Sequence, residues 1–145
     1  MNSDFFGAFL RSSDTLQVYE GDHLVFSSQK ERLLPLFEYI VRFAPYHRNV
    51  AIFDKVMGNA AALLSIKAGS QEVYSPLGSQ LAAETLDRYG IRYHLAKVVP
   101  YIQAVSKKAM CPMEKLSIGK GPAEFCGLLR GKLGTERGSK AEWKL

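Results

Sequence analysis

Residues 49–69 read NVAIFDKVMGNAAALLSIKAG, and this stretch decides the fold. Val50–Phe53 is a short apolar run of residues that favour β-structure, which is typical of a buried strand. The run ends at Asp54-Lys55, and Gly58-Asn59 then opens an alanine-rich helical segment that stops at Gly69. A strand, a charged turn and a helix start place polar groups and free backbone N–H groups at one edge of an α/β sheet. We therefore predict the functional site at this edge.

Strand and helix signals alternate on both sides of this stretch. Upstream they predict a short helix near Phe5–Leu10, a hairpin of Thr15–Tyr19 and His23–Phe26, and an amphipathic helix within Lys30–Phe43. Downstream they predict a strand at Gln71–Tyr74, a turn at Ser75–Gly78, a helix capped by Ser79, a strand at Ile91–Val99, a helix start at Cys111–Glu114 and a last helix at Ala123–Leu133. This order predicts an α/β fold, a three-layer α/β/α sandwich with a mixed sheet of about five strands.

Length and composition indicate one domain. A chain of 145 residues buries roughly 68–70% of its unfolded surface, which is enough for a core. We assign residues 1–134 to this domain and residues 135–145 to a polar, mobile tail. No apolar run approaches the roughly 20 residues of a membrane helix, and the first residues do not resemble a signal peptide. The expectation is a cytoplasmic protein without membrane contact, with its two cysteines reduced.

The formal charge of +5 is concentrated in the last third of the chain, where nine bases outnumber four acids. These bases are Lys107, Lys108, Lys115, Lys120, Arg130, Lys132, Arg137, Lys140 and Lys144. A nucleic-acid patch is one interpretation, but no aromatic residues alternate with the bases to stack on nucleobases. We therefore favour a solvated basic face, and leave open whether the chain forms a homo-oligomer.

The charged turn after the central strand supplies the candidate ligand site. Asp54 would accept a hydrogen bond and Lys55 would hold an anion, because ligands bind at strand ends in open α/β sheets. Gly58 and Asn59 open the next helix, where Asn59 would cap the helix or donate to a ligand. The competing interpretation is a turn whose charges face water and whose Asn only caps.

Cys111 is the candidate nucleophile. It precedes a helix start and has Lys115 nearby in sequence, a setting that lowers the pKa of a thiol. Glu114 would act as general acid or base, or would only be an acid favoured in a first helical turn. The competing interpretation of Cys111 is a buried structural thiol, and Cys126 is expected in the core.

Two motifs resemble those of an uncharacterised family whose fold is similar to that of cytidine deaminase. They are FDKVMGNAAALL at residues 53–64 and CPMEKL at residues 111–116. The resemblance covers roughly residues 5–133. It implies a deaminase-like sandwich with the hairpin strands at one side of the sheet and the parallel strands at the other.

The resemblance does not bring zinc chemistry with it. Zinc deaminases place His-x-Glu at the start of one helix and Pro-Cys-x-x-Cys at the start of the next. By topology these positions correspond to Ser27–Glu31 and Asp54–Gly58, and neither stretch contains His or Cys. No metal and no cofactor are therefore expected.

Matching the motifs by residue identity, in place of topology, does not restore a zinc site either. It pairs Cys111 and Glu114 with the two deaminase cysteines, and Asn59 with the histidine. Ala61 then stands where the catalytic Glu belongs, so a zinc site is lost under either mapping.

Three hypotheses follow. The first is a deaminase-like domain without zinc that binds a nucleotide or a related phosphorylated metabolite. The second is a cysteine-based enzyme that uses Cys111. The third is a nucleic-acid or scaffold module that uses the basic last third of the chain.

Overall fold

The computed structural model describes residues 2–43, 47–103 and 109–135. The tail predicted at 135–145 lies, apart from its first residue, outside these residues. The elements are α1 (Asn2–Arg11), β1 (Leu16–Glu20), β2 (His23–Ser28), α2 (Leu34–Phe43), β3 (Val50–Asp54), α3 (Asn59–Lys67), β4 (Ser70–Ser79), α4 (Gln80–Arg88), β5 (Arg92–Val99), α5 (Pro112–Ser117) and α6 (Pro122–Thr135). None of these helices combines the length and hydropathy needed to cross a membrane.

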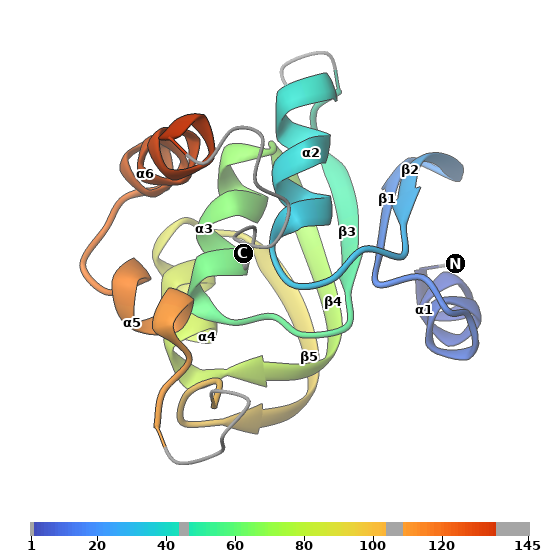
Figure 1. Ribbon diagram of the computed structural model, residues 1–145. Coiled ribbons are helices and arrows are strands. Elements are labelled where there is room, and N and C mark those ends of the chain that lie inside the picture. Colours follow the sequence, from blue (N-terminus) through green and yellow to red (C-terminus); the bar gives the residue numbers. More distant parts are fainter. Residues whose placement is uncertain (1, 44–46, 104–108, 136–145) are drawn as a thin grey trace.

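The five strands form one open mixed sheet in the order β2-β1-β3-β4-β5 (Figure 1). β1 pairs antiparallel with β2 and with β3, whereas β3, β4 and β5 are parallel. Because β2 and β3 are both antiparallel to β1, they run in the same direction. The carboxyl ends of β2, β3, β4 and β5 therefore meet at one edge of the sheet, which we call the carboxyl edge.

β3 lies in the middle of the sheet and is buried along its whole length. Its side chains alternate between the two faces, as the period of a strand requires. Val50 and Ile52 join the large core under the helices, whereas Ala51 and Phe53 face the other side. The apolar run that suggested a buried strand is confirmed.

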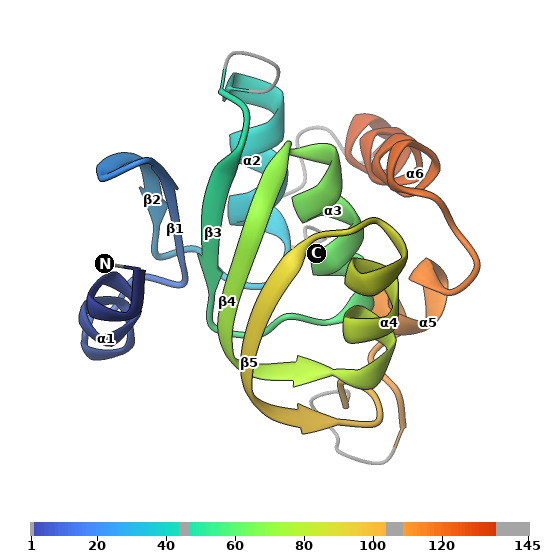
Figure 2. The same cartoon turned by 180° about the vertical axis from the view of Figure 1, so that it is seen from behind.

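α1 lies on one face of the sheet, at the side of β1 and β3, and leaves most of β4 and β5 uncovered there (Figure 2). Phe6 and Phe9 of α1 pack on Phe53, with ring centroids 6.3 and 6.0 Å apart. Phe53 also stacks on Tyr74 of β4 at 4.9 Å. Burial of these rings holds α1 in place.

The opposite face carries α2, α3 and α4, with α5 and α6 packed against α3 (Figure 1). Ala60, Ala61 and Ala62 are all buried. Their small side chains let the backbone of α3 approach its neighbours closely, as the alanine-rich sequence predicted. The prediction of helices on both sides of a mixed α/β sheet is confirmed.

The predicted turn at Ser75–Gly78 is wrong, because β4 continues through it to Ser79. Pairing with β3 stops at Tyr74, whereas pairing with β5 resumes at Leu77 opposite Lys97. Pro76 is therefore tolerated, because its missing N–H removes no hydrogen bond to β3 there. Ser79 then caps α4 as predicted, with its Oγ accepting from the N–H of Ala82 at 3.0 Å.

Candidate functional site

Asp54 is the last residue of β3 and lies at the carboxyl edge. Only 8% of its surface is exposed. By the alternation of a strand, its side chain is on the same face of the sheet as Ile52, which is the face that carries α2, α3 and α4. Burial raises the pKa of Asp54 from 3.8 to about 7, opposed by hydrogen bonds from the backbone of Val56 and Lys55. Among the described residues no basic side chain forms an ion pair with this carboxyl group. Asp54 is therefore a buried acid that titrates near neutral pH.

Lys55 turns toward α1 instead. Its ammonium group donates to the carbonyl oxygen of Ser12 at 3.0 Å and lies 4.7 Å from the centre of the Phe9 ring. Both contacts tie the end of β3 to the end of α1. The sequence could not show this direction, and the anion-binding role given to Lys55 stays a prediction.

The start of α3 is closed by Glu114 of α5. Gly58 is the N-cap residue of α3 and has no side chain to cap it. One carboxylate oxygen of Glu114 accepts from the N–H of Asn59, and the other accepts from the N–H of Ile102 at 2.8 Å. A negative charge from a distant helix therefore satisfies an N–H group at the positive end of α3.

The side chain of Asn59 continues this network. Its amide nitrogen donates to the Oγ of Ser117 at 2.9 Å, and its amide oxygen accepts from the hydroxyl of Thr85. Ser117 Oγ in turn donates to the carbonyl oxygen of Glu114 at 2.6 Å. We call Asn59, Thr85, Glu114 and Ser117 the buried polar cluster, since all four are at most 5% exposed. Asn59 is thus the first residue inside α3, and its side chain does not cap the helix.

Gly58 is required by the close approach of α5 and of Ile102. A Cβ at this position would stand 2.9 Å from Glu114 Oε1 and 2.9 Å from Ile102 Cγ1. Such distances are shorter than real side-chain contacts, so any larger residue would displace Glu114. The sequence identified Gly58 as a helix start, and the structure adds that it makes room for a carboxylate.

The residues around Cys111 do not converge on a catalytic arrangement. Cys111 precedes α5 and is partly exposed, and its N–H donates to the carbonyl oxygen of Ile102 at 2.8 Å. Glu114 is engaged with two backbone N–H groups, and Lys115 faces solvent. Cys126 is 1% exposed in the core, as expected. The hypothesis of a cysteine-based enzyme stays a prediction.

Metal-binding groups are not gathered anywhere in the described part of the chain. Three or more His, Cys, Asp or Glu side chains never come close enough there to hold a metal ion.

The hypothesis of a basic nucleic-acid module also stays a prediction, because five of its nine bases lie outside the described residues. These five are Lys107, Lys108, Arg137, Lys140 and Lys144.

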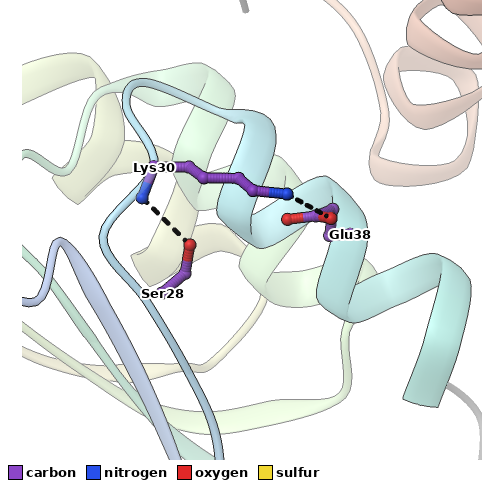
Figure 3. Close-up of polar contacts among 3 residues, drawn as sticks. All are labelled: Ser28, Lys30 and Glu38. Atoms are coloured by element: carbon purple, nitrogen blue, oxygen red, sulfur yellow. Dashed lines mark hydrogen bonds and ion pairs between the residues drawn. The ribbon is translucent and has the colours of Figure 1, made fainter.

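A cavity of about 490 Å³ opens between the end of β2 and the side of α2. We call it the β2–α2 groove, and it is lined by Phe26, Ser27, Ser28, Gln29, Lys30, Glu38 and Arg42. Figure 3 shows Lys30 reaching from the connection after β2 toward Glu38 on α2, where the ammonium group and the carboxylate are 2.9 Å apart. Ser27–Lys30 lie in the stretch Ser27–Glu31, which corresponds by topology to a deaminase zinc motif, but no ligand-binding role was predicted for any residue of the groove.

The strand order and the positions of the helices define the class of protein, an α/β protein with a five-stranded open mixed sheet and helices on both sides. The model of the family described as TM1506, domain of unknown function (DUF1893), matches residues 8–129, and the chain belongs to this family. The crystal structure of a DUF1893 family protein (TM1506) from Thermotoga maritima is similar in fold. That structure has a TM-score of 0.81 and 25% sequence identity, over 90% of this chain and 88% of that chain. No curated protein matches the chain.

Proposed function

We propose that the chain is a deaminase-like domain without zinc that binds a nucleotide or a related phosphorylated metabolite at the carboxyl edge. The observation that carries the proposal is Asp54, a buried carboxyl group at a strand end with no basic partner among the described residues. Buried acids with raised pKa values are concentrated at functional sites. Strand ends are also where open α/β sheets bind ligands.

The strand order supports the deaminase-like assignment. An antiparallel hairpin occupies one side of the sheet, and the parallel strands β3, β4 and β5 occupy the other. This is the arrangement that the resemblance implies. The helices α2 and α3 both begin at the carboxyl edge, at the two positions where zinc deaminases carry their ligands.

The chemistry at these two positions supports a function without zinc. Ser27–Glu31 precedes α2 and Asp54–Gly58 precedes α3, and neither stretch has a His or Cys. The start of α3 is instead held by the carboxylate of Glu114. The His and Cys ligands with which zinc deaminases hold their metal are therefore missing from these two stretches.

Asp54 would recognise a hydroxyl or a base edge of the ligand. With a pKa of about 7, its carboxyl group is protonated in part of the molecules near neutral pH, so it both donates and accepts hydrogen bonds. Burial makes such a hydrogen bond stronger than it would be in water. The same burial penalises the charged form, so a donor from the ligand would lower the pKa of Asp54.

Thermal shift and calorimetric titration against a panel of nucleotides test the proposal. We expect at least one nucleotide to stabilise the wild-type protein and to bind about tenfold more weakly to Asp54→Asn, a change that removes the charge but keeps the shape. Asp22→Asn is the matched control, because Asp22 is an exposed acid in the hairpin turn. Equal binding by wild type and Asp54→Asn, or no stabilisation by any nucleotide, would contradict the proposal.

A further inference from the structure

The two anion-binding groups first expected at the carboxyl edge are engaged inside the protein. Lys55 donates to the carbonyl oxygen of Ser12, and the start of α3 accepts the carboxylate of Glu114. A phosphorylated ligand at this edge would therefore need other cations. The described residues supply them in the β2–α2 groove.

The groove combines two cations with neutral donors and an aromatic wall. Lys30 and Arg42 are both exposed, and Ser27 and Ser28 are on the same lining. The guanidinium group of Arg42 lies 5.1 Å from the centre of the Phe43 ring and 5.9 Å from that of Phe26, and the second of these rings is on the groove lining. These two cation–π contacts limit the positions that Arg42 adopts.

Glu38, the one acid among the described residues of the lining, is a weak competitor for an incoming anion. Its ion pair with Lys30 is exposed, with 56% of the Lys30 side chain and 29% of the Glu38 side chain accessible. Exposed pairs of this kind contribute only about 0–1 kcal/mol. A phosphate monoester carries about −1.5 to −2 charges and several acceptor oxygens, so it attracts Lys30 more strongly than a single carboxylate does.

The end of the groove formed by Ser28 and Lys30 is close to the end of β3, where Asp54 lies. The hydroxyl of Thr15 lies within hydrogen-bond distance of the carbonyl oxygens of Ser28 and Lys30, and the N–H of Lys55 donates to the carbonyl oxygen of Thr15 at 3.2 Å. β2 and β3 are separated by β1 alone, so their carboxyl ends are about 10 Å apart.

We propose that the β2–α2 groove binds the phosphate group of a small phosphate monoester. Lys30 and Arg42 hold the phosphate oxygens, the hydroxyl of Ser28 donates to one of them, and Phe26 forms an apolar wall. The volume of about 490 Å³ is within the range of small-molecule sites. The inference rests on the proposed function, because it gives a place to the phosphate of that ligand.

A second cavity of about 580 Å³, at the beginning of β5, is less suited to an anion. Two acids, Glu72 and Asp87, lie on its lining beside a single arginine, Arg92, and their negative charges disfavour an incoming anion. It also lies at the amino ends of β4 and β5, opposite to the carboxyl edge.

Titration with inorganic phosphate at constant ionic strength, followed by NMR of the backbone amides, tests the groove directly. We expect shifts at Ser28 and Lys30, and binding about tenfold weaker in the double variant Lys30→Met/Arg42→Met. The control is Lys67→Met/Lys97→Met, which removes two exposed cations outside the groove and leaves the same net charge. Equal weakening in both double variants would reduce the effect to net charge and overturn the proposal.

Glu38→Gln gives a test in the opposite direction. It removes the competing carboxylate but keeps the shape, so we expect phosphate to bind about threefold more tightly. A structural role of the Lys30–Glu38 pair alone would not produce this gain. Unchanged or weaker phosphate binding in Glu38→Gln would count against the groove.

The two proposals fail in different ways. A nucleotide that binds wild type and Lys30→Met/Arg42→Met equally, but not Asp54→Asn, would overturn the groove and leave the proposed function standing. Phosphate that binds in the groove while no nucleotide binds would support the groove as an anion site and contradict the proposed function.

Discussion

Two helices begin at the same edge of the sheet, and their surroundings differ. At the start of α3, the buried polar cluster satisfies its own polar groups, and Glu114 closes the end of the helix. Beside α2, the β2–α2 groove presents two cations to solvent, Lys30 before the helix and Arg42 in its last turn. The difference teaches that a charged group near a helix start is not by itself a site. Glu114 holds the fold together, whereas Lys30 and Arg42 are accessible to a ligand.

Asp54 lies between these two regions and gives the largest expected effect. Its pKa is raised from 3.8 to about 7 in the folded state, so the folded protein binds more protons than the unfolded chain between these values. The contribution of protonated Asp54 to the free energy of unfolding is complete below pH 3.8 and is lost as the pH rises to about 7. The total loss is about 4 kcal/mol at most, at 1.36 kcal/mol per pKa unit.

Asp54→Asn should remove this dependence, because the amide stays neutral and its oxygen still accepts from the N–H of Val56. Urea unfolding at pH 5 and pH 8 measures it. We expect the variant to be more stable than wild type at both values, by about 4 kcal/mol at pH 8 and by less than about 2 kcal/mol at pH 5, because wild type loses most of the difference between these two pH values. If the free energy of unfolding changed with pH in the same way in both proteins, Asp54 would be ionised in the folded protein, with its charge stabilised by hydrogen bonds as in the buried polar cluster.

Glu114→Ala should give the next largest effect. The change leaves the N–H groups of Asn59 and Ile102 without partners in a buried place, at about 1–3 kcal/mol for such a group, and we expect a loss of about 3 kcal/mol. Glu114→Gln keeps one acceptor and should lose about half as much. The control is Glu124→Ala, an exposed acid at the start of α6. Equal stabilities of Glu114→Ala and Glu124→Ala in urea would mean that the cluster does not hold α5 to α3.

Gly58→Ala tests the same closure from the other side. The added Cβ would meet Glu114 and Ile102 at 2.9 Å, and we expect a destabilisation of about 2 kcal/mol from the resulting displacement. Gly127→Ala in α6 is the matched control, because nothing lies within 4 Å of its Cβ. That control should be about 0.5–1 kcal/mol more stable than wild type, since alanine is the better helix former. If both substitutions changed the unfolding midpoint alike, the close approach of α5 would not constrain position 58.

The sequence predicted those parts of the fold that depend on local signals. The apolar run of β3, the hairpin of β1 and β2, and the cap at Ser79 each depend on residues a few positions apart. The end of β4 was missed because pairing with β5 decides it, whereas the local sequence Ser75–Gly78, with its Pro and Gly, is typical of a turn.

The sequence predicted where Asp54 lies in the fold, but not the contacts that Glu114 and Lys55 make. Asp54 lies at the carboxyl edge as expected, because the end of an apolar run marks it. The contact of Glu114 with Asn59 joins residues 55 positions apart, and no spacing rule reaches that far. The direction of Lys55 toward Ser12 depends on the packing of α1, which the sequence does not fix.

The smallest expected effect concerns the open region. Removing the Lys30–Glu38 pair by Lys30→Met or Glu38→Gln should change the free energy of unfolding by less than about 0.5 kcal/mol, since exposed ion pairs contribute little. A double-mutant cycle in urea, at low and at high salt, isolates the coupling between the two side chains. We expect a coupling near zero at high salt, where screening is strong. A coupling of several kcal/mol that salt does not change would make this pair a structural contact like those of the buried polar cluster. The β2–α2 groove and the start of α3 would then no longer differ in this way.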